Sequence, residues 1–488
     1  MSKKLLIRWL SAVLALGMLA AACGSDRDDD TATDAGDTTT TAAAPDEGDG
    51  GDEGEGGDDT TTTEAAPETD PCEGVTLEAT DTGVTEDTIK VIVMADVDSP
   101  LAPGLFAGSR DGVLAWADAV NANGGLACRQ VEAEFHDSKL DGTQTVAGFL
   151  KACDSALALV GTTVLFGLDT ADLNSCPNAN GDPIGVADIA YITTEVPHQC
   201  SANSFHLSRP GATCPYEGGD REYTVATGAQ EFLAESLGVD FNGVFIVPAD
   251  LPSTVASAVP ITEGQAQAGV TWDAIFGASG AATQAEYGQY VAAIRENGSN
   301  YVYNGSNDQA MLKMKREAAV QGIDVDSITW LCSLSCYTPA FIEEGGADAE
   351  GVYVWMFFLP FEEADTNENL SAFLDGIGTD FPPAWAAGAW MDGLLFEQSV
   401  NRIVDRDGPN GVTRQSLLDE LAATESFDAG GWVSPADFST TNAIGNCFVL
   451  LQVQNGEYVR VQPTERGELD CSYPGRAVTA NPETFELD

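Results

Sequence analysis

The 488-residue sequence predicts an α/β protein built as two doubly wound lobes with mainly parallel sheets. From residue 88 onward, short β-rich runs alternate with longer helical runs, which is the pattern of repeated βαβ units. The alternation restarts after SRPGATCPYEGG (208–219), a stretch rich in glycine, proline and cysteine. About 400 residues in two such blocks exceed the usual size of one lobe, and two lobes are therefore expected.

The first block begins with IKVIVMA (89–95), an apolar run typical of a strand buried on both faces. The following SRDGVLAWADAVNAN has helical periodicity. Its apolar face is formed by Val113, Trp116, Ala117 and Val120. The helix is expected to end at NANGG (121–125), because glycine takes a left-handed turn that a residue with a Cβ resists. The next predicted elements are a strand at 130–137, a helix at 143–153 and strands at 156–163 and 183–188.

The second block follows the same alternation. Its predicted elements are, in order, a helix at 222–238, strands at 243–250 and 271–277, a helix at 283–297, a strand at 300–306, a helix at 308–322, and strands at 327–333 and 350–358. Helices at 385–403 and 413–423 come next. In CFVLLQVQNGEYVRVQ (447–462), the pair Asn455-Gly456 between alternating apolar residues predicts a β-hairpin.

The N-terminus, MSKKLLIRWLSAVLALGMLAAAC, has the pattern of an export signal. A basic start precedes an apolar run too short to span a membrane, so residues 1–22 are predicted to be a signal peptide. Small residues directly before Cys23 resemble a bacterial lipobox, in which the cysteine carries lipid and becomes the mature N-terminus. The alternative is an ordinary secretory signal cleaved near Ala22. The lipidated form would stand on the outer face of the cytoplasmic membrane.

Residues 23–85 are predicted to comprise the lipidated cysteine and a disordered acidic tether. Residues 24–75 hold almost no large apolar side chains and cannot offset the entropy cost of ordering. They contain 18 of the 77 acidic residues, so the folded part carries most of the formal net charge of −56. Nucleic-acid binding needs clustered Lys and Arg, and this charge argues against it.

Ten cysteines besides Cys23 predict disulfides, because their number is even and the chain is expected to be exported. Zinc would need a ligand quartet, and no histidine lies near the closest pair in sequence, so no metal is expected. From the expected topology, the candidate pairs are Cys128 with Cys153, Cys332 with Cys336, and Cys447 with Cys471. Cys176, Cys200 and Cys214 form a second group. A bridge between two of them is expected to pin a long insertion, and Cys72 is expected to pair with the third.

Five segments also stand out for their order and spacing: GVTEDTIKVIVMADVDSP, GVLAWADAVNANGGLACRQVEAEFHDSKLDGTQTVAGFLKAC, ALVG, NYVYNGSNDQAMLKMKREAAVQGI and FPPAWAAGAWMDGLLFEQSV. Together they resemble the type 1 extracytoplasmic solute-binding proteins of ABC transporters, in the branched-chain amino acid (Leu/Ile/Val) binding protein family. The resemblance implies a ligand cleft between two lobes joined by three hinge crossovers, near 207–212, 350–356 and 426–434. It also implies the boundaries 86–208 plus 355–428 for lobe one, 209–354 plus 429–475 for lobe two, and 476–488 for a tail.

In the amino acid binders that this chain resembles, hydroxyls and backbone amides of lobe one hold the ligand carboxylate, a lobe-two glutamate holds the ammonium, and aromatic residues enclose the side chain. Carried over, the ligand-binding positions fall at Leu105, Phe106, Thr163, Leu165, Phe166, Asp188, Thr193, Asp250, Ser253, Asn307, Asp308, Ser335 and Trp385. The loop that supplies the carboxylate-binding hydroxyl in the family is Val164-Leu165-Phe166 here and has no hydroxyl; only the preceding Thr163 could supply one. The stretch LCSLSCYTP has no acidic residue at the position of the ammonium-binding glutamate. The α-amino-acid clamp is therefore expected to be altered at both ends.

Several of these residues also have a purely structural interpretation. Trp385, Leu165 and Phe166 fit a packed core, and Asp188 fits a cap for the next helix. Asn307 and Asp308 fit the N-terminus of the helix that follows them.

The expected function is capture of a small solute, such as an amino acid, an amide or a related compound, by hinge closure for uptake. The partners would be an ABC permease and ATPase complex and, through the lipid anchor, the membrane, with the chain monomeric and without a cofactor. One alternative is a ligand-sensing surface lipoprotein that transports nothing. An enzyme is the remote alternative, because the sequence has no GxSxG, HExxH, P-loop or strand-linked GxGxxG motif and only three histidines.

Overall fold

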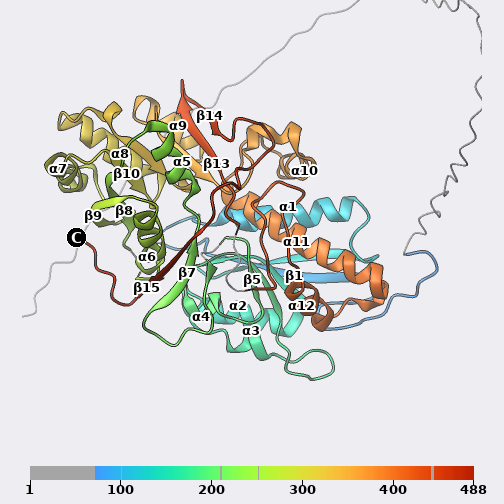
Figure 1. The fold of residues 1–488 in the computed structure, drawn as a ribbon. Helices are drawn as coiled ribbons and strands as arrows, with labels where there is room; N and C mark the ends of the chain where they lie inside the picture. The colour runs from blue at the N-terminus through green and yellow to red at the C-terminus, as the bar shows by residue number, and fades with distance from the viewer. Residues whose placement is uncertain (1–71, 101, 209–210, 251, 441–444) are drawn as a thin grey trace, which may run out of the picture. The chain divides into compact units, whose positions relative to one another are not determined.

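The computed structural model describes residues 72–488 except 101, 209–210, 251 and 441–444. The predicted signal peptide, Cys23 and most of the predicted tether lie outside the described residues. The described chain forms an α/β fold with mainly parallel sheets in two lobes, which confirms the predicted fold class (Figure 1).

Lobe one is built on a five-stranded parallel sheet. Its strands are β1 (Thr88–Ala95), β2 (Gln130–Asp137), β3 (Ala158–Val164), β4 (Ala187–Thr193) and β5 (Ser204–His206), in the spatial order β2-β1-β3-β4-β5. Its helices are α1 (Ala107–Ala122), α2 (Gly142–Ser155), α3 (Ala171–Ser175), α4 (Val196–Gln199), α10 (Glu368–Ile377), α11 (Ala384–Asp407) and α12 (Arg414–Ala422), with short 3-10 turns at Phe361–Thr366 and Pro409–Gly411.

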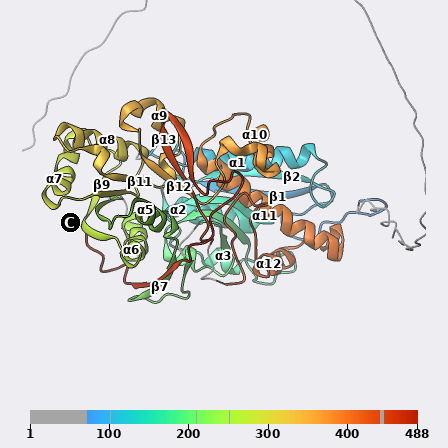
Figure 2. The ribbon, with the colours of Figure 1, turned by 45° about the horizontal axis from the view of Figure 1, so that its top comes forward.

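Both faces of this sheet are covered, which explains the continuous apolar run of β1. Val91 and Val93 belong to the large core under α1 and α11, whereas Ile92 and Met94 belong to the core under α2. Helices α1 and α11 lie side by side over the sheet in both views (Figure 2). They approach closely because Gly112 has no side chain: a Cβ there would lie 2.3 Å from the carbonyl oxygen of Ala386.

Lobe two is built on a seven-stranded sheet. Its strands are β8 (Asn242–Pro248), β9 (Thr271–Ala278), β10 (Tyr301–Asn304), β11 (Thr329–Cys332), β12 (Tyr353–Met356), β13 (Val449–Gln454) and β14 (Glu457–Gln462), in the order β14-β13-β12-β11-β10-β8-β9. Strands β8 to β12 are parallel, and β13 and β14 form the antiparallel hairpin predicted at Asn455-Gly456. Its helices are α5 (Gly228–Leu237), α6 (Pro252–Gln267), α7 (Gly288–Asn297), α8 (Asp308–Val320) and α9 (Pro339–Gly345), with 3-10 turns at Gln284–Tyr287, Val325–Ser327, Leu334–Cys336 and Gly346–Asp348.

A third, small sheet has the order β15-β7-β6 and comprises β6 (Gly211–Ala212), β7 (Arg221–Val225) and β15 (Arg476–Ala480). β15 pairs antiparallel with β7, so the segment 476–488, which was expected to be a tail, belongs to the fold. Beyond β15, Asp488 pairs with Ile275 through a backbone hydrogen bond of 2.9 Å. At the other end, residues 72–85 are ordered within the predicted tether range and include the buried Val84.

The chain passes between the two large sheets three times: after β5, after β12 and before β13. The second and third passages run side by side. The Ser434 amide donates to the Phe357 carbonyl at 2.7 Å, and the Leu359 amide donates to the Trp432 carbonyl at 2.9 Å. These passages lie at or next to the crossover segments implied by the resemblance.

Two predicted elements are wrong in position or type. The strand expected at 183–188 lies at Ala187–Thr193, because Pro183 and the positive φ of Gly185 (82°) interrupt the extended backbone. The helix expected at 222–238 is split, with β7 at its start and α5 beginning only at Gly228. The strand forms because its partner β15 lies about 250 residues away in sequence, which local periodicity does not reveal.

The described cysteines form five disulfides: Cys72–Cys128, Cys153–Cys176, Cys200–Cys214, Cys332–Cys336 and Cys447–Cys471. The last two confirm the expected pairs. The expected bridge between Cys128 and Cys153 is wrong: Cys153, at the end of α2, pairs instead with Cys176, which follows the neighbouring helix α3. The expected pairing of Cys72 is wrong as well, since the ordered N-terminal segment brings it to Cys128.

The stop NANGG behaves as predicted. Gly124 and Gly125 both have positive φ, 107° and 87°, and a Cβ on Gly125 would meet the carbonyl oxygen of Arg129 at 2.1 Å. Within the described residues, no helix is long and apolar enough to cross a bilayer.

Candidate functional site

The topology places the candidate site between the lobes. Strand β5 lies parallel to β4 and leads into the first passage, so the carboxyl ends of the lobe-one strands face that passage. Strand β12 lies parallel to β11 and leads into the second passage, so the lobe-two strands point toward the hinge in the same way. Ligands of open α/β sheets bind at these carboxyl ends.

The carboxyl edge of lobe one carries an aromatic wall, which we define as the buried Phe106 and Tyr191 and the partly exposed Phe357 and Trp385. Trp385 contacts Phe106 edge-on at a centroid distance of 5.7 Å and Tyr191 at 6.1 Å. Tyr191 in turn contacts Phe357, the first residue of the second passage, at 6.3 Å. Apolar side chains continue this surface: Leu105, Leu140, Leu165, Phe166 and Ile192.

A buried carboxylate holds the loops that carry this wall. Asp96, which follows β1, accepts hydrogen bonds from the Ser138 hydroxyl (2.7 Å) and from the amides of Leu140 (2.7 Å) and Leu165 (2.9 Å). It thereby ties together the loops after β1, β2 and β3. Burial raises the pKa of Asp96, while these hydrogen bonds to the carboxylate lower it.

The lobe-one hydroxyls predicted to bind ligand are already engaged. Thr163 is fully buried and donates to the Gly161 carbonyl at 3.1 Å, and Thr193 is hydrogen-bonded to His206 at 3.1 Å. Asp188 is fully buried near the start of β4, where it is 2.7 Å from His198 and accepts a hydrogen bond from Ser204. These three residues lie within the lobe, where their polar groups are used by protein partners.

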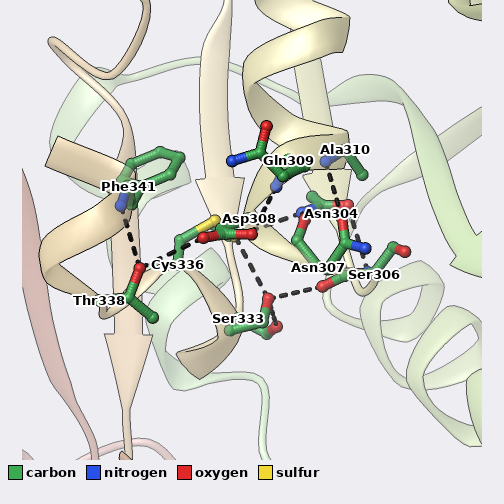
Figure 3. The surroundings of a disulfide bond; sticks show 12 residues. Asn304, Ser306, Asn307, Asp308, Gln309, Ala310, Ser333, Cys336, Thr338 and Phe341 are labelled. Atoms are coloured by element: carbon green, nitrogen blue, oxygen red, sulfur yellow. Dashed lines mark hydrogen bonds between the residues drawn. A yellow bond between two sulfur atoms is a disulfide. The ribbon is translucent and has the colours of Figure 1, made fainter. Parts of the chain in front are cut away.

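On lobe two, the carboxyl edge is polar. The turn closed by Cys332–Cys336 carries the serine loop, which we define as residues 333–335. The Ser335 hydroxyl donates to the Ser306 carbonyl at 2.6 Å and lies 3.0 Å from the Ser333 hydroxyl. Both serines are partly exposed. Figure 3 shows this turn beside the loop that follows β10.

Asn307 and Asp308 begin α8, as their structural interpretation predicted. Asn307 is the N-cap and accepts from the Ala310 amide at 2.9 Å. Asp308 accepts from the Thr338 hydroxyl at 3.3 Å, and its pKa is raised chiefly by burial (Figure 3). The side chain of Asn307 is nevertheless exposed at this edge, so capping the helix and facing a ligand are compatible roles.

Asp250 lies in the next loop of the same edge. It accepts hydrogen bonds from the Ser279 hydroxyl at 2.6 Å and the Gly280 amide at 2.7 Å. Gly280 also lies close to Asn307: a Cβ on Gly280 would be 3.5 Å from the side-chain amide nitrogen (Nδ2) of Asn307. Ser253 belongs to the first turn of α6.

The structure therefore brings the predicted site residues together as two surfaces. Leu105, Phe106, Leu165, Phe166 and Trp385 gather on lobe one, and Asp250, Asn307 and Ser335 gather on lobe two. Sequence reasoning missed Tyr191, Phe357, Ser279 and Ser333. The strand period carries a signal for Tyr191, which lies on the same face of β4 as Ile189 and toward α11, where a Cβ on Gly388 would overlap its ring.

Within the part of the chain that the structure describes, no cluster of three or more His, Cys, Asp or Glu side chains has the arrangement of a metal site. The chemistry present at the two surfaces is apolar contact from lobe one and hydrogen bonding from lobe two. It suits binding of a small molecule.

Comparison with known proteins adds the following. A family model described as periplasmic binding protein matches residues 88–457. The fold resembles an ABC transporter substrate-binding protein from Aeropyrum pernix, with a TM-score of 0.58 at 14% identity, covering 77% of this chain and 95% of that one. It also resembles a branched-chain amino acid transporter substrate binding protein from Streptococcus pneumoniae in complex with isoleucine (TM-score 0.55, 16% identity, 77% and 100% covered).

A third similar structure is a fatty acid ABC transporter substrate-binding protein from Thermomonospora curvata, with a TM-score of 0.54 at 14% identity, covering 86% of this chain and 98% of that one. At these identities the likeness is one of fold. No curated protein matches the sequence.

Proposed function

The chain belongs to the periplasmic binding protein family, a family of binding proteins rather than enzymes, and from this premise we propose that it is the solute-binding lipoprotein of an ABC transporter. It captures a small solute between its two lobes, closes around it by hinge motion and presents it to a permease and ATPase complex. The anchor is lipid on Cys23, with residues 24–71 as the spacer.

The observation that carries this proposal is the complementary pair of surfaces at the carboxyl edges of the two sheets. The aromatic wall offers apolar contact area, and lobe two offers the neutral donors and acceptors of the serine loop and Asn307 beside the carboxylate of Asp250. Three passages at the hinge connect these surfaces, and closure would bring them onto opposite sides of one solute.

The same surfaces favour a solute other than a simple branched-chain amino acid. At the position expected for the ammonium-binding glutamate the chain has the serine loop, and where a carboxylate-binding hydroxyl loop is expected it has Leu165 and Phe166. An amide, a peptide-like compound or an aromatic acid with a sizeable apolar group fits better. Among the similar structures, one protein is named for fatty acids and another was solved with isoleucine, so this fold accommodates both kinds of solute.

Thermal unfolding of the purified chain with a panel of solutes tests the proposal. The panel contains leucine, valine, benzamide, benzoate, octanoate and glucose. A solute at about one hundred times its Kd stabilises the folded state by about 2.7 kcal/mol, which raises Tm by several degrees in a saturable way. A response to leucine or valine alone would contradict the altered clamp.

A variant of the wall locates the binding site. Trp385→Ala is expected to weaken binding of the stabilising solute at least tenfold, because it removes the central ring of the wall. The control is Val320→Ala at the end of α8, where the native side chain is 75% exposed. Equal affinity in both variants would place the solute elsewhere.

Transport is tested in cells. Deleting the chain is expected to abolish uptake of the radiolabelled solute, and expressing it again is expected to restore uptake. Uptake that persists without the chain, combined with solute binding in vitro, would favour the ligand-sensing alternative.

A further inference from the structure

A cavity of about 230 Å³ lies at the hinge, beside the aromatic wall. All three passages contribute to its lining: Leu207 and Ser208 follow β5, Phe357 follows β12, and Ser434 and Cys447 precede β13. Lobe two completes the lining, chiefly with Ile261, Tyr303 and Trp355.

The lining is neutral. It includes no Asp, Glu, Lys, Arg or His among the residues that the structure describes there. The Trp355 indole N–H donates to the Tyr303 hydroxyl at 3.1 Å, and the Ser434 hydroxyl accepts from the Cys447 amide at 3.0 Å. Burial raises the pKa of Tyr303 to about 12, so its phenol stays uncharged. Ser208 and Gln230 are the other polar side chains in the lining, and most of the remaining lining residues are apolar, so the cavity offers an occupant mostly apolar contact.

The cavity and the candidate site share one residue. Phe357 lines it and is also part of the aromatic wall, in contact with Tyr191 at 6.3 Å. Phe357 is therefore the side chain at which a solute on the wall would meet the hinge cavity.

Its volume indicates what it can hold. Pockets that enclose a whole drug-sized ligand measure about 300–1,000 Å³, so this cavity suits one group of a ligand. An apolar protein cavity of about 150 Å³ already binds benzene. The volume at the hinge thus fits a single aromatic ring or an alkyl chain of similar size.

We propose that this cavity is a subsite for an uncharged aromatic ring or alkyl chain of the transported solute, which extends from the cleft into the hinge. The proposal rests on the proposed solute-binding function and adds the class of group that the solute carries. An occupant here contacts each of the three passages, so burial of its apolar surface is coupled to the position of the hinge.

Fluorobenzene is the probe for the subsite, observed by ¹⁹F NMR with the full chain. Saturable binding is expected, and Ala226→Leu, which fills part of the cavity, is expected to weaken it at least tenfold. The matched control is Ala422→Leu at the exposed end of α12, which is expected to bind like the wild type. Absence of saturable binding, or unchanged binding in Ala226→Leu, would overturn the proposal.

Two further measurements make the outcome independent of how that variant folds. Crystals of the wild-type chain under xenon pressure are expected to show a xenon atom between Phe357 and Ile261, and xenon bound only elsewhere would overturn the subsite. Any panel solute that stabilises the chain is also expected to displace fluorobenzene. A stabilising solute that leaves fluorobenzene bound would remove the subsite but leave solute capture intact, whereas a panel without any stabilising solute would count against solute capture itself.

Discussion

Arg414, at the start of α12, is fully buried and holds the end of another helix. Its guanidinium group donates to the carbonyl oxygens of Ala152 and Cys153, both at 2.8 Å, and to that of Ala156. These carbonyls lie at the C-terminus of α2, where the helix dipole favours a cation and where, of the three, the Ala152 carbonyl also accepts from the Ala156 amide. One side chain therefore fixes α12, and with it the end of α11, to the opposite face of the sheet.

Replacing Arg414 with methionine is expected to lower the free energy of unfolding by about 3 kcal/mol, because the buried carbonyl oxygens of Cys153 and Ala156 lose their guanidinium donor. Urea denaturation measures this change. The matched control is Arg406→Met, since the native Arg406 side chain is 52% exposed and its removal is expected to leave the midpoint unchanged. Equal midpoints for both variants would contradict the role of Arg414.

Asp392 on α11 is fully buried, and burial together with the nearby charge of Asp188 raises its pKa well above the usual range. The folded state therefore keeps its proton at a pH where the unfolded chain has lost it. Its contribution to stability is complete below a pH of about 4 and is lost as the pH rises toward the folded-state pKa.

Asp392→Asn removes this pH dependence. We expect the variant to gain stability relative to the wild type progressively as the pH is raised from about 4 to 8, as measured by urea denaturation across that range. Asp405→Asn, at an exposed position of the same helix, is the control. A difference between Asp392→Asn and the wild type that stays constant with pH would show that Asp392 is ionised in the folded chain.

At the scale of elements, periodicity predicted what local sequence controls. The strand at 130–137 agrees with β2 residue for residue, and NANGG ends its helix at the two glycines because their left-handed backbone excludes a Cβ. Local sequence did not predict pairings between segments that are far apart in the chain. Strand β7 forms only because β15 pairs with it, and Cys128 is bonded to Cys72 instead of Cys153. The site shows the same division. The apolar residues of lobe one were predicted from the family resemblance, whereas Phe357 joins the wall only through the path of the second passage.

The Cys332–Cys336 bridge closes the turn that carries Ser333 and Ser335. Replacing both cysteines with alanine is expected to cost about 2 kcal/mol of stability for so short a loop and to weaken solute binding at least tenfold, because the two hydroxyls lose their fixed positions. The control is Cys72→Ala/Cys128→Ala, which removes a bridge beside the amino end of β2, away from the site. Solute affinity that falls equally in both double variants would indicate a general loss of stability instead of a local role.

At the scale of the whole molecule, the chain combines a strongly acidic folded part with the N-terminal lipobox-like sequence. Most of the formal net charge of −56 lies on the folded part, where it favours solubility. The apolar wall and the neutral hinge cavity favour a solute that carries an uncharged apolar group. The lipid anchor proposed at Cys23 would keep such a receptor beside its permease.

Cys23→Ala is expected to abolish incorporation of radiolabelled palmitate and to release the chain from the membrane fraction, because the proposed acceptor thiol is gone. Cys72→Ala serves as the control, since Cys72 belongs to a disulfide. Mass spectrometry of the wild-type N-terminus reports the same step: cleavage near Ala22 without lipid on Cys23 would establish an ordinary secretory signal.

The central claim is that two lobes close around a solute. Small-angle X-ray scattering of the purified chain, with and without a saturating concentration of the solute that most raises Tm, tests it most directly. The account predicts that the radius of gyration falls on binding, because the hinge closes the cleft. A solute that binds saturably while the radius of gyration stays constant would contradict capture by hinge closure.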